Sequence, residues 1–155
     1  MNNSDYHQIQ AKLNRGIKVL SFAVVALLAM IAFNIVVSVF RLPISFDPIR
    51  VILPDILLNY GLMALSGGEI GLGIVFMAVF LIIIGVLVLF LINVFKAKAW
   101  AFLWSAFYCL LEIPFLIIVR NFYAVGVHLL LGILLIYGMR LCLVSRQIDK
   151  RMWSF

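Results

Sequence analysis

The chain has 155 residues, of which 66% are hydrophobic and only 12% are charged, and its net charge is +6. Soluble domains contain about 45–50% apolar and about 25% charged residues, so this chain has too few polar side chains to cover a water-facing surface. The composition excludes a soluble enzyme, a disordered tail and a disulfide scaffold, and it indicates an integral membrane protein. At about 20 apolar residues per span, the length allows about four spans and no sizeable soluble domain.

Four apolar runs are long enough to cross a bilayer as helices. They cover about residues 17–40, 72–95, 100–119 and 122–144. The first run follows Lys12 and Arg15, as the core of a signal peptide would, but it is too long for such a core and contains no A-x-A site, so we expect a retained helix. The joints at 96–99 and 120–121 are short, which makes neighbouring spans antiparallel. These features predict a single all-α domain that forms an up-down transmembrane four-helix bundle.

Basic residues gather on one side of this predicted bundle. They are Lys12, Arg15 and Lys18 near the amino end, Lys96 and Lys98 in the second joint, and Arg140, Arg146, Lys150 and Arg151 near the carboxyl end. The positive-inside rule places this side, and therefore both termini, in the cytoplasm. Because membrane orientation explains the positive charge, no nucleic-acid partner is implied.

The longest connection, residues 41–71, is the least apolar part of the chain and is expected on the outer face. Asp47 followed by Pro48 is typical of a helix start. Apolar residues then recur at helical spacing, namely Ile49, Ile52, Leu53, Ile56, Leu57, Tyr60 and Met63. Pro54 should kink or restart this helix, and residues 66–68 should end it. We expect one or two short amphipathic helices that lie in the outer interface or cap the bundle.

Two titratable side chains, Glu112 and His128, lie well inside predicted spans. Each is eight residues from Arg120, so in an antiparallel hairpin both lie about 12 Å below the joint. An unpaired charge near the bilayer centre costs about 2.5–3.5 kcal/mol, which favours a facing partner. We therefore expect Glu112 to pair with His128 within an intramembrane polar cluster. Its further members are Asn34, Ser105 and Tyr108. Such a pair can join two helices or carry protons, and the sequence leaves both roles open.

No motif of an enzyme or cofactor site is present. The chain has no H-E-x-x-H, no G-x-S-x-G and no Walker loop, and no second carboxylate lies near Glu112. Cys109 and Cys142 form no C-x-x-C and have no pair of histidines nearby. We therefore expect no enzymatic activity, no cofactor and no metal site.

Two segments carry a family resemblance. The junction KAKAWAFLW, residues 96–104, and the tail LVSRQIDKRMWSF, residues 143–155, resemble small four-span bacterial membrane proteins. These proteins, which are largely uncharacterised, have a basic second joint with tryptophan and a short tail that ends in Trp and an aromatic residue. Phe102 stands where that family often has Arg. The resemblance runs from the second joint to the carboxyl end, implies a bacterial inner membrane protein, and carries over no activity.

The short loops leave no room for a catalytic domain. We therefore expect a small non-enzymatic accessory or interaction protein that acts through helix packing and through its outer segment. Its partners would be the lipid bilayer and another membrane protein or a second copy of the chain, with Arg50, Asp55 and Asn59 on the partner-facing surface. The alternative is a small proton- or cation-linked transporter or oligomeric pore that uses Glu112 and His128.

Overall fold

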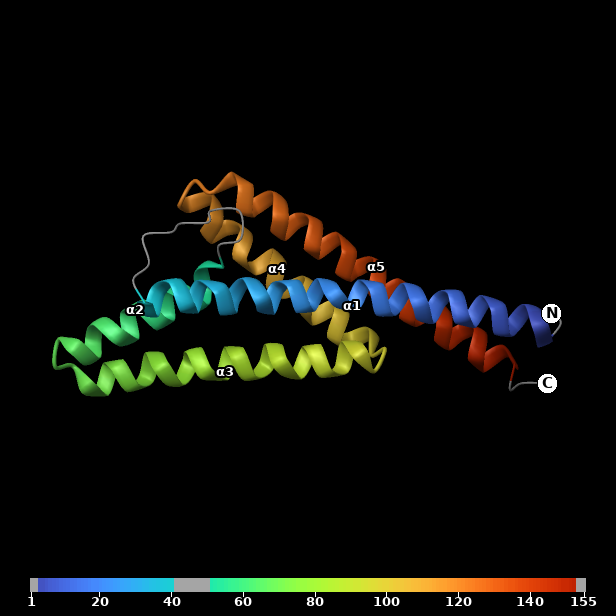
Figure 1. Ribbon diagram of the computed structural model, residues 1–155, viewed down its shortest axis with the longest axis horizontal. Coiled ribbons are helices and arrows are strands. Elements are labelled where there is room, and N and C mark those ends of the chain that lie inside the picture. Colours follow the sequence, from blue (N-terminus) through green and yellow to red (C-terminus); the bar gives the residue numbers. More distant parts are fainter. Residues whose placement is uncertain (1–2, 41–50, 153–155) are drawn as a thin grey trace.

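The computed structural model describes residues 3–40 and 51–152. Within these residues it contains five helices and no strand: α1 (Asn3–Phe40), α2 (Ile52–Ser66), α3 (Ile70–Phe95), α4 (Ala99–Ile118) and α5 (Phe122–Met152) (Figure 1). Four of them, α1, α3, α4 and α5, are long and apolar enough to cross a membrane. The predicted all-α fold with four spans is confirmed, and the chain is a multi-pass membrane protein.

The three joints from α2 to α5 are closed by the same backbone turn. Each contains one residue with positive φ, namely Gly68 (86°), Ala97 (52°) and Arg120 (58°). The residue that follows donates its N–H to a carbonyl five positions back: Glu69 to Ala64 (2.9 Å), Lys98 to Asn93 (3.0 Å) and Asn121 to Leu116 (2.9 Å). This is the pattern of a Schellman motif, which ends a helix within a few residues. Consecutive helices are therefore antiparallel, and α2 ends at Ser66 as predicted.

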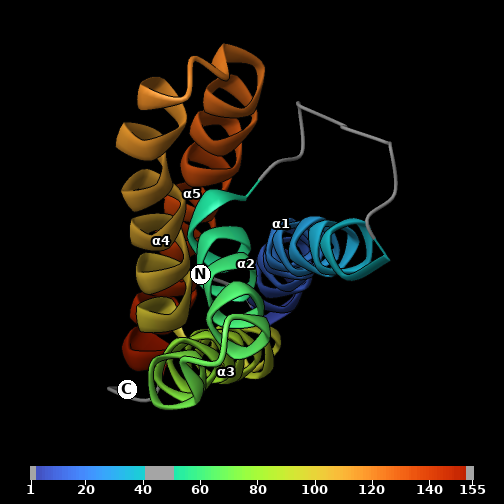
Figure 2. The same ribbon diagram turned by 90° about the vertical axis from the view of Figure 1, so that its left-hand side faces the viewer.

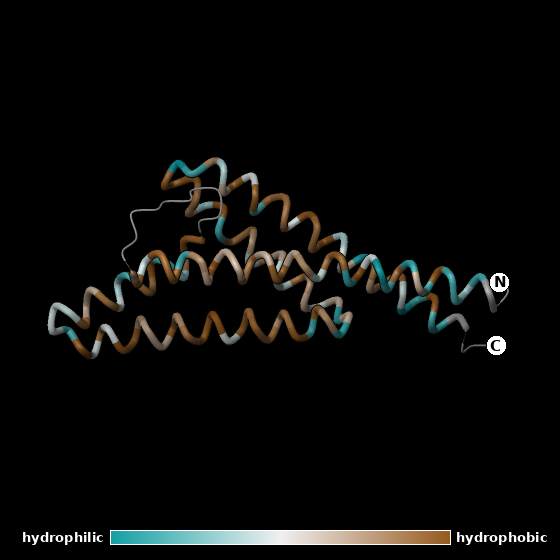
Figure 3. Tube along the Cα trace, in the orientation of Figure 1, coloured by the Kyte–Doolittle hydropathy of each residue, from teal (hydrophilic) through white to brown (hydrophobic). Residues whose placement is uncertain are grey.

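The amino end of α1 and the carboxyl end of α5 extend together beyond the other helices, as Figure 1 shows. Both extensions are more hydrophilic than the rest of their helices (Figure 3). The Tyr6 hydroxyl donates to Asp149 Oδ1 at 2.6 Å, and Gln10 Nε2 donates to Ser145 Oγ at 2.7 Å. Both termini thus lie at one end of the bundle, which we call the terminal end.

The core of the described residues lies among α1, α3, α4 and α5, and its largest fully buried side chain is Phe102. Phe102 packs against Gly138 of α5, where an added Cβ would lie only 2.5 Å from the phenyl ring. At the α2–α3 contact, a Cβ on Gly73 would meet the Leu65 side chain at the same distance. Both glycines therefore allow neighbouring helices to approach closely.

The short helix α2 lies between the spans. Seen from the end of the molecule, α4 and α5 are on one side of α2, α1 is on the other and α3 is below it (Figure 2). Consistent with this view, α2 contacts α1, α3 and α4. Its amino-terminal end is inside the bundle, because Val51 is 0% exposed and Ile52 is 3% exposed. The expected cap or interfacial helix is therefore inserted by one end among the spans.

The buried face of α2 overlaps the predicted apolar face only in part. Pro54, Leu58 and Gly61 line the buried face, whereas Tyr60 and Met63 of the predicted apolar face are exposed. Ile52 of the predicted apolar face is buried as well. The two sets overlap only in part because the helix is apolar nearly all round, so hydrophobic periodicity does not show which side packs on protein. Pro54 is the third residue of a helix that begins at Ile52, so it lies in the first turn, where proline is tolerated. The predicted start at Asp47 and Pro48 lies outside the described residues.

Candidate functional site

Glu112 forms the central polar contact of the described spans. Its side chain is 0% exposed on the face of α4 that also buries Ser105 and Cys109. Oε2 accepts the N–H of Ile52 at 2.9 Å and that of Leu53 at 3.2 Å. Oε1 accepts the Leu53 N–H at 3.1 Å. The carboxyl group of α4 therefore caps the amino-terminal end of α2.

The start of α2 explains why an acceptor is needed there. The first N–H groups of any helix have no partner within the helix. Val51 occupies the N-cap position and makes no side-chain cap hydrogen bond, because valine has no acceptor. Pro54, two residues into the helix, has no N–H at all. Only the N–H groups of Ile52 and Leu53 need partners in the helical part of this first turn, and Glu112 accepts both. The positive end of the helix dipole also favours a carboxyl group at this position.

This contact lies well below the surface of the bundle. Glu112 precedes the last residue of α4 by six positions, which at about 1.5 Å per residue places it roughly 9 Å inside that end of the helix. Water is scarce at such depth in a bilayer, so unpaired backbone groups there are costly. Glu112 therefore allows the chain to start a helix inside the membrane region.

Tyr108 holds the carboxyl group from its own helix. It lies one turn before Glu112, and its hydroxyl donates to Oε1 at 3.0 Å. Tyr108 was predicted in the polar cluster, and this hydrogen bond places it there. We expect Tyr108→Phe, which keeps the ring and removes the donor, to lower the free energy of unfolding by about 0.5–1.5 kcal/mol. Denaturant unfolding in detergent micelles measures this change, and Tyr123→Phe, at an exposed tyrosine of α5, is the control that should leave stability unaltered.

His128 does not pair with Glu112. Its Nδ1 lies 2.9 Å from the Ala124 carbonyl oxygen of its own helix, and its Nε2 is buried without a hydrogen-bond partner. The predicted pair is therefore wrong. Equal depth along two helices is necessary for contact, but each side chain must also point toward the other. Glu112 instead points to the donors of α2.

The remaining members of the predicted cluster are dispersed. Ser105 is 0% exposed and its hydroxyl has no hydrogen-bond partner. It lies seven residues before Glu112, about 10 Å along α4. Asn34 is half-buried on α1. The hydrogen bonds described around Glu112 thus join it to Tyr108 and to the first turn of α2.

Of the residues predicted to face a partner, Arg50, Asp55 and Asn59, the two on α2 do not share one environment. Asp55 Oδ1 accepts the Ser38 hydroxyl of α1 at 2.6 Å and the Asn59 amide at 2.8 Å. Asp55 therefore joins α2 to α1, while Asn59 is exposed. Arg50 lies outside the described residues. The short helix is thus held from two sides, by Glu112 of α4 and by Ser38 of α1.

The sequence analysis did not predict that α2 is held by both Glu112 and Ser38. One signal for it was present, since Val51 cannot cap the helix that Pro54 helps to start. A helix start without its own acceptor, in a chain with few polar side chains, needs an acceptor from another helix. Glu112 is the only acidic residue in α4.

The described residues contain no group of three or more His, Cys, Asp or Glu that could hold a metal ion. Cys109 and Cys142 are buried and free. The chemistry available at the site is hydrogen-bond acceptance by one buried carboxyl group. Comparison with known proteins finds no matching family model, no matching curated protein and no matching solved structure.

Proposed function

We propose that this protein is a non-enzymatic accessory or interaction protein of a bacterial inner membrane, and that it binds another membrane protein through helix packing. The buried polar groups that have partners serve to hold its own helices together, as Glu112 and Asp55 do. A surface that is free for a partner must therefore be sought on the outside of the bundle.

The observation that carries this proposal is the outward face of α3. The buried residues of α3 form a single line at seven-residue spacing, namely Gly73, Phe80, Leu87 and Val94. The nearly opposite face has small residues at the same spacing, Gly71, Ala78 and Gly85, and all three are exposed. A Cβ added at Gly71 or Gly85 would meet no atom within 4 Å. Small residues allow membrane helices to pack closely, so this line, the α3 outer face, fits a helix of another protein.

The exposed end of α2 offers a second surface. Tyr60 and Met63 of α2, with Leu72 and Phe76 of α3, border a hollow of about 250 Å³ beside Glu69. Asn59 is exposed next to Tyr60. This arrangement supports the expectation that the segment between the first two spans contributes to partner binding.

The distribution of charge supports cytoplasmic termini. The terminal end and the α3–α4 joint carry an excess of basic residues, including Lys12, Lys18, Lys96 and Lys98, over the acidic Asp5 and Asp149. The opposite end has Arg120 together with Glu69. By the positive-inside rule, the end with the basic excess faces the cytoplasm.

Photocrosslinking in intact cells tests the proposal. A photoreactive residue at Ala78 on the α3 outer face, or at Asn59 on α2, is expected to give a discrete adduct with another protein. The same residue at Ile133 of α5, which is 63% exposed and lies on a different helix, is the control and should give lipid adducts. Lipid adducts alone at both Ala78 and Asn59 would contradict the proposal.

The transporter alternative rested on a pair between Glu112 and His128. The hydrogen bonds of both residues contradict that pair. We therefore do not propose transport for this protein.

A further inference from the structure

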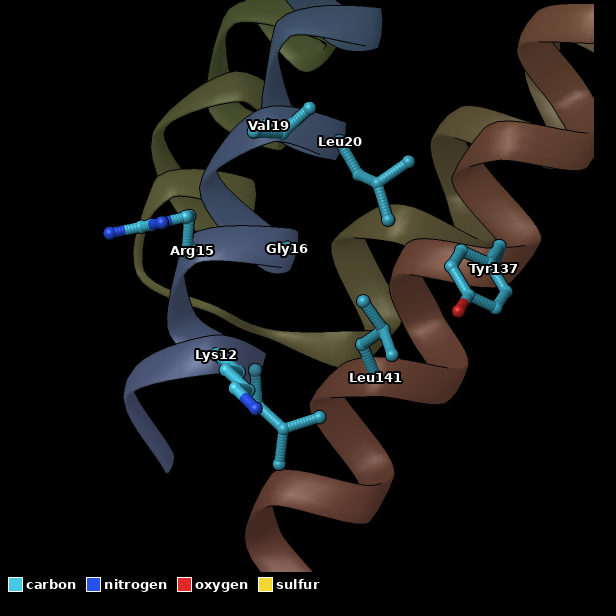
Figure 4. Close-up of a pocket in the computed structure, with 8 residues that line it drawn as sticks. Lys12, Arg15, Gly16, Val19, Leu20, Tyr137 and Leu141 are labelled. Carbon is cyan, nitrogen blue, oxygen red and sulfur yellow. The ribbon is translucent and has the colours of Figure 1, made fainter. Parts of the chain in front are cut away.

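A groove between α1 and α5 opens near the terminal end of the bundle (Figure 4). It has a volume of about 520 Å³. Its lining includes Lys12 and Arg15 of α1, followed by the apolar side chains of Val19 and Leu20. On α5 it is lined by Tyr137 and Leu141. The groove therefore has a charged part and an apolar part.

These two parts lie at different depths of the membrane. Lys12 and Arg15 precede the apolar run that starts at Ile17, whereas Val19 and Leu20 lie about one turn inside it. Tyr137 lies on the facing stretch of α5, one turn before Leu141 (Figure 4). Lysine and arginine at the ends of spans lie at the level of lipid headgroups, with their stems along apolar surface. The groove thus runs from the headgroup level into the hydrocarbon region.

The charged side chains among the described lining residues of the groove, Lys12 and Arg15, are both basic. None of the groove's described lining residues is acidic, and two more basic residues, Lys18 and Arg140, lie within one turn of the lining residues. Asp149, an acidic residue at the same end, is engaged by the Tyr6 hydroxyl farther along the helices. In Figure 4, Lys12 lies near the mouth of the groove, and Arg15 extends from the side of α1 away from α5. Among the described residues, an anion bound in the groove would therefore meet the Lys12 ammonium group, with Arg15 about one turn away and no competing carboxylate.

We propose that this groove binds a phospholipid with an anionic headgroup. The phosphate would lie beside Lys12 at the mouth of the groove, where Arg15 could reach it through a change of its side-chain rotamer. The first part of one acyl chain would lie along Val19, Leu20 and Leu141. An amphipathic lipid matches both parts of the groove, because its anionic head is joined directly to an apolar chain. A transmembrane helix of a partner would cover the apolar part but leave the two cations without a counter-charge. The attraction of basic residues to anionic lipids is a general feature of membrane surfaces.

Native mass spectrometry tests the proposal with the full-length protein in mixed micelles that contain equal amounts of phosphatidylglycerol and phosphatidylcholine. One phosphatidylglycerol molecule should remain bound in preference to phosphatidylcholine. Lys12→Gln combined with Arg15→Gln should weaken its binding by about tenfold or more, since each charge contributes to the attraction. Lys96→Gln combined with Lys98→Gln removes the same charge at the α3–α4 joint, outside the groove, and should leave this binding unchanged.

A third variant tests the apolar part. Val19→Trp at a 62% exposed position fills the groove without changing the charge, and it should also remove the bound lipid. Thermal unfolding of each variant should match the wild type, because Lys12, Arg15 and Val19 are exposed. Equal loss of lipid in both charge variants, or equal retention of the two lipids by the wild type, would overturn the proposal. A dimer that Val19→Trp disrupts, with no lipid bound, would also overturn it and would assign the groove to a second copy.

Discussion

Replacing Glu112 with alanine is expected to release the first turn of α2 from α4 and to destabilise the protein strongly. The change removes the acceptor for the N–H groups of Ile52 and Leu53, which lie inside the bundle where water cannot easily replace it. Each buried N–H left without a partner costs about 1–3 kcal/mol. The free energy of unfolding in detergent micelles should fall accordingly. Amide hydrogen exchange at Ile52 and Leu53 should accelerate more than exchange in α4.

Two further variants separate this capping role from an effect of charge. Glu112→Gln keeps one carbonyl oxygen at the same place, so its loss of stability should be smaller than that of the alanine variant. Glu69→Gln removes an exposed glutamate that makes no side-chain cap hydrogen bond, and it should leave stability unchanged. Unaltered exchange at Ile52 and Leu53 in Glu112→Ala would show that the carboxyl group does not hold α2.

Gly138→Ala is expected to disrupt the packing of α4 on α5. The new Cβ would lie 2.5 Å from Cε1 and 2.6 Å from Cδ1 of the Phe102 ring, closer than real Cβ contacts allow. Phe102 is 0% exposed, so its ring can avoid the new Cβ only by displacing its neighbours or by separation of the two helices. Overpacking of this kind costs about 1–3 kcal/mol. Thermal unfolding of the purified protein in micelles measures the loss.

The same helix provides matched controls for this prediction. A Cβ at Gly132 would make only ordinary contact with Leu110, at 3.7 Å, and one at Gly126 would meet nothing within 4 Å. Gly132→Ala and Gly126→Ala should therefore leave stability unchanged or raise it slightly, because alanine favours a helix over glycine. Phe102→Leu should restore part of the stability lost in Gly138→Ala, since it removes the atoms that clash. Equal stability of all three glycine variants would refute the close α4–α5 contact.

The polar site shows how far sequence reasoning reaches in this chain. The sequence identified Glu112 as a buried carboxyl group that needs a partner, and the structure confirms both points. It did not identify that partner. Side-chain candidates such as His128 can be found by spacing and depth, whereas backbone N–H groups exist at every residue except proline. The N–H groups of Ile52 and Leu53 become available only because a helix begins at this place in three dimensions.

The amino-acid sequence by itself determined the four spans, the short antiparallel joints and the end of α2, because long apolar runs and turn residues act locally along the chain. Only the tertiary structure decided where α2 inserts, which of its faces is buried and what Glu112 binds. In a membrane protein, side chains that face lipid and side chains that face protein are both apolar, so hydrophobic periodicity does not distinguish them. Contacts between helices make that distinction, and they depend on the rotation of each helix about its axis.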